Sequence, residues 1–375
     1  MHPDKASPFE LFQAEFGQLS DPRRSGQVIY PLEEILFLVL SGVISDCNSW
    51  DEIEDFGQDQ LEWLRGYYPY QRGIPRHDTL NRVISLLDSQ VLSTHFSRWI
   101  SSWVDLPPAT LINLDGKTSR GSKGSQGEKA VHLVNAFAND LQMVLGQVAT
   151  EEKSNEITAI PTLLSLLHIK GCVITIDAMG TQKAIARQII DGEADYVLAL
   201  KNNHPELYTQ VIESFERLTP IDTYEQVEKN RSRIERRKVE LLDDFSWIEP
   251  EIVAQWAGMG QIARVFRQRE SLINAKIETE TSYYLLSGHQ AAQVMAQAIR
   301  GHWGVENRLH WRLDVLFGED QDRKRTEQAA ANFSAFRKMA QNLLLNNRTR
   351  KASLPRKRKM AARNQSFRNE IIHGL

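Results

Sequence analysis

The apolar residues of this chain change their spacing near residue 108, and this change restricts the folds that the chain can adopt. Before the linker Leu106-Pro107-Pro108, apolar residues recur every three or four positions, as on the buried side of a helix. After the linker, short β-branched runs alternate with single helical segments. We therefore predict a helical N-terminal domain over residues 1–105 and a mixed α/β domain over residues 109–345.

The N-terminal helices are predicted from apolar spacing and from the residues that precede each helix. A helix buried on most sides is expected at about 30–44. Ser49-Trp50-Asp51-Glu52 has the spacing of a capping box, and His77-Asp78 and Asp88-Ser89 are expected to cap the next two helices. A small helical domain fits DNA binding or the positioning of DNA ends, although such domains are common and no recognition helix rich in Arg, Asn and Gln is evident.

Two aspartates follow strands of the predicted α/β domain. Asp115 follows the first of these strands, and Asp177 follows a β-branched run. Ligands of open α/β sheets gather outside the carboxyl ends of strands, so both aspartates are candidate site residues. Each one alone also suits a turn that ends a strand. The expected elements are a strand at 110–114, a hairpin at 131–138 and 143–148, a helix at 157–167, a strand at 172–176, a helix at 182–190 and a strand at 196–200.

A third acidic residue, Glu306, lies in a segment with the spacing of an amphipathic helix, residues 298–315. His302 and His310 lie four residues before and after it, so all three side chains are expected on one helical face. A carboxylate beside buried tryptophans needs a cation or hydrogen-bond donors to stay charged. The same spacing also fits a surface glutamate between two imidazoles.

Asp115, Asp177 and Glu306 together would supply hard oxygen ligands. Mg²⁺ prefers such ligands and keeps waters and substrate phosphates in its other positions. Two such ions bound by shared carboxylates activate the attacking oxygen and stabilise the leaving oxygen in a displacement at phosphorus. The sequence has no His-Glu-x-x-His motif and no Cys–His spacing of a zinc site, so zinc is not expected.

The residues after Asp115 form a loop rich in Gly, Ser and basic side chains, which include Lys117, Arg120 and Lys123. Such a loop fits close contact with phosphates, and it also fits a hydrated surface loop. Gly116-Lys117-Thr118 is not part of a P-loop. The position five before Gly116 is Leu111, where that motif requires glycine.

Positive charge is concentrated toward the end of the chain, although the formal net charge is −3. A basic C-terminal tail is expected at 346–375, and from residue 348 it has nine Lys or Arg and one acidic residue. The tail suggests a polyanionic partner, although a solvated end is the commoner explanation. A β-rich insertion is expected at about 220–288. Its Arg and Lys side chains either follow a phosphate backbone or line the wet face of an antiparallel sheet.

The two cysteines, Cys47 and Cys172, lie in or beside apolar runs, which favours reduced, buried thiols in the cytosol. The N-terminus lacks the apolar region of a signal peptide, and the longest apolar run is too short to span a bilayer. A cytoplasmic protein without a membrane partner is therefore expected.

Five ordered motifs resemble those of the H repeat-associated transposases of bacterial insertion sequences, which belong to the DDE class. A region near residues 30–53 is also similar to the domain associated with that family, so the likeness covers nearly the whole chain. The motifs are Leu114–Thr118, Glu152–Ile157, Thr175–Gly180, Tyr196–Lys201 and Arg300–Asn307.

The resemblance implies an RNase H-like mixed sheet in which Asp115, Asp177 and Glu306 bind Mg²⁺ or Mn²⁺. It implies double-stranded DNA as partner, in the form of terminal inverted repeats and target DNA. Water would first attack a phosphodiester at the element's end, and the freed 3′-hydroxyl would then attack the target. Because two DNA ends must be paired, an active homodimer is expected, in the bacterial cytoplasm in association with the nucleoid.

The chain departs from the wider superfamily beside Glu306. That superfamily has Arg four residues before the Glu and Lys seven after it, whereas this chain has His302 and Leu313. We hypothesise that His302 or His310 touches the DNA end, with Lys201 and Arg300 as further candidate phosphate contacts. A purely hydrolytic metal-dependent nuclease and a DNA-binding protein that no longer catalyses remain alternatives.

Overall fold

The computed structural model describes residues 6–123, 129–150, 156–230, 232–302 and 304–375. They belong to two compact units. The first comprises residues 1–105, 116–168 and 306–375, and the second comprises 106–115 and 169–305. The chain therefore passes from one unit to the other directly after Asp115 and directly before Glu306, two of the three predicted metal ligands.

Two of the three helix starts predicted from capping residues in the first unit are confirmed. The capping box at Ser49 is present, because its hydroxyl accepts from Glu52 N–H while Glu52 accepts from Ser49 N–H. Asp88 likewise caps its helix. The cap expected at His77-Asp78 is wrong, since that helix begins at His77 itself and Arg76 is its N-cap residue. The helices before the sheet are α1 (Pro8–Phe16), α2 (Leu32–Ile44), α3 (Trp50–Asp59), α4 (Leu61–Leu64), α5 (His77–Leu86) and α6 (Ser89–Trp103).

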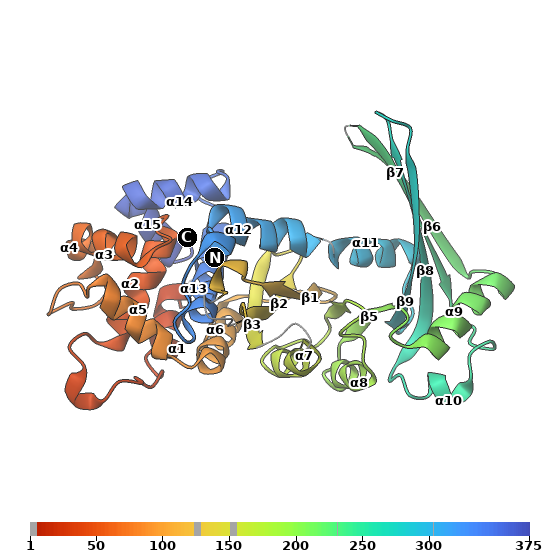
Figure 1. Ribbon diagram of the computed structural model, residues 1–375, viewed down its shortest axis with the longest axis horizontal. Helices are drawn as coiled ribbons and strands as arrows, with labels where there is room; N and C mark the ends of the chain where they lie inside the picture. Colours follow the sequence, from red (N-terminus) through yellow and green to blue (C-terminus); the bar gives the residue numbers. More distant parts are fainter. Residues whose placement is uncertain (1–5, 124–128, 151–155, 231, 303) are drawn as a thin grey trace. The chain divides into compact units, whose positions relative to one another are not determined.

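Helix α13 (Ala329–Asn346) lies at the centre of the first unit, with α2, α5, α6 and β3 packed around it (Figure 1). Every residue of this helix from Ala329 to Leu344 is buried. Its charged side chains are therefore enclosed with it. Arg337 is 1% exposed and Lys338 is 0% exposed.

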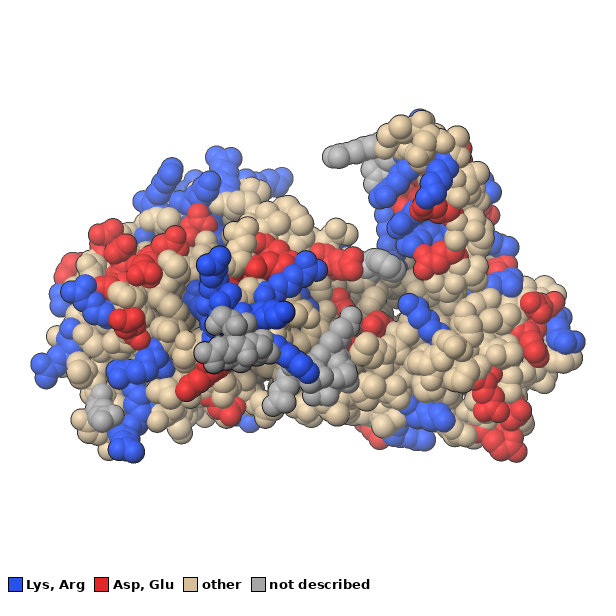
Figure 2. All heavy atoms as spheres, in the orientation of Figure 1, with Lys and Arg blue, Asp and Glu red and all other residues tan. Residues whose placement is uncertain are grey.

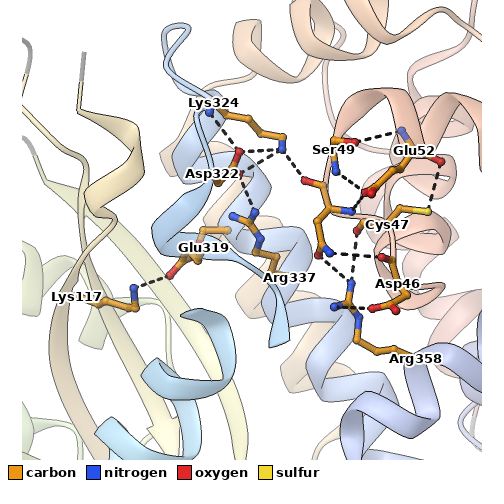
Figure 3. A network of polar contacts seen from close by, with 12 residues as sticks. Asp46, Cys47, Ser49, Glu52, Lys117, Glu319, Asp322, Lys324, Arg337 and Arg358 are labelled. Carbon is orange, nitrogen blue, oxygen red and sulfur yellow. Dashed lines mark hydrogen bonds and ion pairs between the residues drawn. The ribbon is translucent and has the colours of Figure 1, made fainter. Parts of the chain in front are cut away.

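The C-terminal segment folds as α14 (Leu354–Arg363) and α15 (Gln365–Ile372), and not as a free tail. Arg358 is fully buried, donates hydrogen bonds to the carbonyl oxygen of Val43, and lies 3.0 Å from an Asp46 carboxylate oxygen (Figure 3). The guanidinium of Arg368 lies 4.4 Å from the centre of the Trp63 ring. Arg358 and Arg368, which were expected on a solvated end, thus bind the C-terminal segment to the N-terminal helices.

The strands follow one hydrogen-bonded order, β3-β2-β1-β4-β5-β9-β8-β7-β6. Strands β1, β4 and β5 pair in parallel, whereas β2 with β3 and all pairs from β5 to β6 are antiparallel. The sheet is therefore mixed, as expected. The strands are β1 (Leu111–Thr118), β2 (His132–Ala138), β3 (Met143–Thr150), β4 (Val173–Ile176), β5 (Asp195–Leu200), β6 (Asp222–Asn230), β7 (Arg233–Leu242), β8 (Met259–Ser271) and β9 (Ile277–Ser287).

The β-rich segment expected at about 220–288 continues the sheet of the second unit. Strand β9 pairs with β5 through registers such as Leu198 with Leu285. Helix α11 (Ala292–His302) packs its Met295 and Ile299 side chains on this sheet. The other helices of the second unit are α8 (Lys183–Asp191), α9 (Pro205–Arg217) and α10 (Pro250–Val253).

Acidic partners accompany the basic side chains on β6 to β9, and Figure 2 shows both signs of charge together on these long strands. Arg237 lies 2.6 Å from Glu235, and Arg236 lies 3.3 Å from Glu225. Cross-strand pairs of opposite charge stabilise an antiparallel sheet. Of the two interpretations of this segment, the solvent-exposed face of a sheet is thus the one that the contacts favour.

No helix in the described residues is long and apolar enough to cross a membrane. Both cysteines are buried and free, as expected from their apolar surroundings. Burial raises the pKa of the Cys47 thiol to about 12, with a smaller contribution from Glu52, so this thiol stays protonated at neutral pH.

Candidate active site

Asp115 and Asp177 come from neighbouring parallel strands of the second unit. Leu114 and Ile176 are partners in the register of β1 and β4, and the two aspartates are the next residue along each strand. Asp177 directly follows β4, whereas β1 continues for three residues beyond Asp115. The prediction that both aspartates stand at strand ends is therefore correct for Asp177 only. Both side chains are half-buried.

The Asp177 carboxylate is also held by the turn that follows it. Its Oδ1 accepts hydrogen bonds from the backbone N–H groups of Met179 and Gly180, at 3.1 and 3.2 Å. The turn interpretation of Asp177 is thus correct, and it is compatible with a site role because the same bonds fix the direction of the carboxylate.

A buried polar network ties the end of α11 to the two aspartate-bearing strands. Asn113 and Thr175 are register partners two residues before Asp115 and Asp177. The Thr175 hydroxyl donates to Asn113 Oδ1 at 2.7 Å, and Asn113 Nδ2 donates to the carbonyl oxygen of Gly301 at 3.0 Å. His302 Nδ1 lies 2.9 Å from Thr175 Oγ1.

This network assigns the tautomer of His302. The single Thr175 O–H proton is used on Asn113, so Thr175 Oγ1 accepts from His302 Nδ1–H. Burial lowers the pKa of His302, and the nearby Asp177 opposes this only in part. A neutral imidazole with its proton on Nδ1 follows. His302 therefore acts here as an anchor for α11, and it carries no charge at neutral pH with which to attract a phosphate.

Glu306 begins a π-helical turn, Glu306–His310, in the first unit, and its side chain is exposed. The described residues of 298–315 are helical, as expected, but not uniformly α-helical. Residue 303 lies outside the described residues, residues 304–305 are α-helical, and the π-helical turn precedes α12 (Trp311–Leu316). Because a π-helical turn has a different spacing, Glu306 and His310 do not keep the α-helical spacing expected of them. π-helical turns inside helices occur frequently at functional sites.

Lys117 lies inside an ion cluster of the first unit, which Figure 3 shows in part. Its side chain is 7% exposed, and its Nζ lies 2.6 Å from Asp314, 3.0 Å from Glu319 and 3.3 Å from Asp320. Burial disfavours the ammonium, but Glu319 and Asp314 outweigh it and raise the pKa of Lys117. The structure thus places this expected phosphate contact against carboxylates of its own chain.

Glu319 is the most deeply buried member of this ion cluster. Burial alone would raise its pKa, but Lys117 and Lys338 lower it to about 2. Glu319 also accepts a hydrogen bond from the Ser334 hydroxyl on α13. The short 3₁₀ turn Glu319–Gln321 therefore begins with a buried carboxylate.

The other expected phosphate contacts have different surroundings. Arg120, Lys123 and Lys201 are exposed, whereas Arg300 pairs with Glu228 at 2.6 Å. His310 is half-buried, and burial with help from Lys117 lowers its pKa to about 4. Residues 124–128 of the Gly- and Ser-rich loop lie outside the described residues, as do residues 152–155 of the motif Glu152–Ile157.

Sequence reasoning missed Asn113 and Thr175, although a signal was present. Asn113-Leu114-Asp115 and Thr175-Ile176-Asp177 share a pattern of polar, apolar and acidic residues. Because strand side chains alternate between faces, this pattern places a polar residue on the same side as each aspartate. Asn113 is 0% exposed and Thr175 is 2% exposed, so both need the partners that the network supplies.

No group of three or more His, Cys, Asp or Glu side chains that could hold a metal ion occurs among the residues that the structure describes. Asp115 and Asp177 do have the chemistry of Mg²⁺ ligands, since both offer carboxylate oxygens from adjacent strands.

Comparison with known proteins identifies the family. A profile described as "Transposase DDE domain" matches residues 80–343, and one described as "DDE_Tnp_1-associated" matches residues 13–100. The chain belongs to the DDE transposase family. The resemblance to H repeat-associated transposases is thereby confirmed, and the associated domain lies within the expected helical region.

Two relatives of this DDE transposase come from Escherichia coli. "Putative transposase YncI" of strain O157:H7 is 40% identical over 365 residues, a match that covers 94% of this chain and 92% of the relative. "H repeat-associated putative transposase YhhI" of strain K12 is 37% identical over 367 residues, with coverage of 95% and 96%. A piggyBac transposase in a synaptic complex with hairpin DNA has a TM-score of 0.42 and 10% identity over 98% of this chain and 82% of that one. This likeness is too low to support a statement on function.

Proposed function

We propose that this transposase cuts the ends of a bacterial insertion sequence and joins the freed 3′-hydroxyl to target DNA. Asp115, Asp177 and Glu306 would act as one set of ligands for Mg²⁺ or Mn²⁺. When bound, these ions supply Lewis acidity that activates the attacking oxygen and stabilises the leaving oxygen. The two aspartates on adjacent strands and the family membership support this proposal.

The bond between His302 and Thr175 is the observation that carries the assignment of Glu306. It ties the end of α11 to β4 at 2.9 Å, two residues before Asp177. Glu306 follows His302 by four residues in the sequence. An extended chain spans at most about 3.6 Å per residue, so the Cα atom of Glu306 lies within about 14 Å of that of His302. This short connection is compatible with one site that is shared by the three carboxylates, as we propose.

The residues around the proposed site have separate tasks. The N–H groups of Met179 and Gly180 orient Asp177, and Asn113 with Thr175 anchors the helix that leads to Glu306. Because no side chain is needed as nucleophile, either water or a 3′-hydroxyl can attack at the same place. One site thus serves both cutting and joining, in the RNase H-like arrangement that we propose for the mixed sheet.

The outer face of α14 is the proposed contact for DNA phosphates. Arg356, Lys359 and Arg363 are exposed at a spacing that puts them on one side of this helix, and Figure 2 shows basic side chains gathered there. None of the three pairs with a carboxylate in the described part of the chain, unlike Arg236 and Arg237 on β7. Such uncompensated charge favours a polyanion.

Because the two ends of an element must be held together, we propose a homodimer as the active form. The nucleoid of the bacterial cytoplasm is where we expect this dimer to find DNA. These assignments rest on the proposed substrate.

The test compares Asp177→Asn with the exposed control Asp191→Asn, using duplex DNA that carries the inverted repeat flanking the gene. Asp177→Asn is expected to bind this DNA and to yield neither nicked nor joined strands, whereas Asp191→Asn yields both. Nicks without joined strands from the unmodified protein would favour a hydrolytic nuclease. No cleavage by the unmodified protein with Mg²⁺ or Mn²⁺ would favour a non-catalytic DNA-binding protein.

A further inference from the structure

A buried pair of titratable side chains lies beside Gly116 in the first unit. His132 Nε2 is 2.6 Å from Glu156 Oε1, and the two side chains are 3% and 5% exposed. The other ring nitrogen of His132, Nδ1, is 2.8 Å from the Thr118 hydroxyl oxygen. Thr118, His132 and Glu156 thus form a hydrogen-bonded row that joins β1, β2 and the first turn of α7 (Glu156–Ser165).

This row packs against the backbone of β1 one residue after Asp115. A Cβ atom at Gly116 would lie 2.2 Å from Glu156 Oε1 and 2.5 Å from His132 Nε2. These distances are too short for any side chain, so only glycine fits while the pair is in place. The pair therefore fixes the path of the peptide that leaves Asp115.

Stability alone gives no reason for burying two ionisable groups at this place. Removing charged side chains from water costs several kcal/mol for each ion, and a well-packed apolar pair is often as stable. What a fully bonded polar row does provide is one defined geometry.

We propose that His132 and Glu156 are positioning residues for Asp115. They hold the Asp115-Gly116 peptide so that the carboxylate of Asp115 is presented in one orientation, and they contact neither metal nor DNA themselves. The inference rests on the proposed function, in which Asp115 is a metal ligand. It also assigns a role to the described end of the motif Glu152–Ile157, which the proposed chemistry leaves unused.

The experiment measures the dissociation constant for Mn²⁺ with full-length protein in the absence of DNA, from the electron paramagnetic resonance signal of free Mn²⁺. Loss of a residue that orients a metal ligand weakens metal binding by about 10- to 100-fold, and this is expected for Glu156→Ala. Glu156→Gln keeps an oxygen that accepts from His132 Nε2–H, so it is expected to bind Mn²⁺ more tightly than Glu156→Ala does.

The matched control is a second His–Glu pair of the first unit with little exposure, His95 with Glu15, whose Nδ1 and Oε1 atoms are 2.8 Å apart. Glu15→Ala is expected to keep wild-type Mn²⁺ affinity even where it lowers the midpoint of thermal unfolding. Gly116→Ala provides an independent way to separate His132 from Glu156. It is expected to weaken Mn²⁺ binding as much as Glu156→Ala does. The double variant Gly116→Ala, Glu156→Ala is expected to bind Mn²⁺ no more weakly than either single variant, because both changes disturb the same contact.

Equal Mn²⁺ affinity of wild type, Glu156→Ala and Gly116→Ala would overturn the positioning role, as would an equal loss in Glu15→Ala. Failure of the proposed function gives a different result. In that case wild type and Asp115→Asn bind Mn²⁺ alike, or neither binds it, and the inference falls together with the function.

Discussion

Asn113 and Thr175 face each other across β1 and β4, and the Thr175 hydroxyl donates a 2.7 Å hydrogen bond to Asn113 Oδ1. Each residue stands two positions before a proposed metal ligand. The same hydroxyl accepts from His302, so one buried oxygen links both strands to the end of α11. A network of this kind fixes the relative positions of its elements more narrowly than apolar packing does.

Replacing Thr175 by valine is expected to destabilise the protein by about 1–3 kcal/mol. Valine has the same shape but leaves Asn113 Oδ1 and His302 Nδ1–H without their buried partner. Urea unfolding measures the change in free energy. Thr209→Val is the control, because the Thr209 hydroxyl is exposed and bonds only to its own helix. Equal unfolding free energies for both variants would show that the network contributes nothing.

Replacing Lys117 by methionine is expected to cost roughly 3–5 kcal/mol of stability, because the buried Glu319 loses the ammonium 3.0 Å away. Lys123→Met is expected to leave stability unchanged, since Lys123 is exposed. If Lys117 were instead a phosphate contact, its replacement would leave the free energy of unfolding unchanged. It would reduce the slope of log DNA affinity against log salt concentration by about 1.

The local elements were predictable because their signals lie within a few residues, as the capping box at Ser49 shows. The π-helical turn Glu306–His310 was not predictable, since the apolar spacing of residues 298–315 continues through it. The burial of Arg358 depends on the carbonyl oxygen of Val43, which lies 315 positions earlier in the sequence. Only tertiary packing distinguishes such an arginine from a solvated one, so the packing of the basic tail against the N-terminal helices was not predictable.

The neighbouring positions of the two aspartates were predictable in part, because parallel strands of one sheet run in the same direction and Leu114 and Ile176 are register partners. The role of His302 was not found. Its neutral state follows from burial and from Thr175, neither of which the spacing to Glu306 reveals.

His310 is expected to make the protein less stable in mild acid. Burial, with help from Lys117, lowers its pKa to about 4 in the folded state, whereas the unfolded chain has the ordinary value near 6.5. Between about pH 6.5 and pH 4, His310 is therefore protonated in the unfolded chain but still neutral in the folded one. The free energy of unfolding falls as the pH is lowered through this range. His310→Gln is expected to reduce this loss, which urea unfolding at several pH values measures. An identical pH dependence of both proteins would exclude the effect.

The exposed face of α14 is expected to contribute about three phosphate contacts to DNA binding. The triple variant Arg356→Gln, Lys359→Gln, Arg363→Gln should reduce the slope of log affinity against log salt by about 2.7, at about 0.9 per phosphate. The control replaces three paired basic residues of the long strands, Arg236, Lys238 and Lys276. If the control lowers the slope as much as the α14 variant, α14 has no special role.

The most direct test of the proposed site is the rate at which Glu306→Gln nicks DNA that carries the element's end. Glu251→Gln serves as the exposed control. If Glu306 completes the metal site with Asp115 and Asp177, nicking should fall by at least roughly a hundredfold, beyond the usual effect of losing an outer-shell partner. DNA binding and unfolding should stay as in the control. Nicking by Glu306→Gln at the wild-type rate would contradict the account.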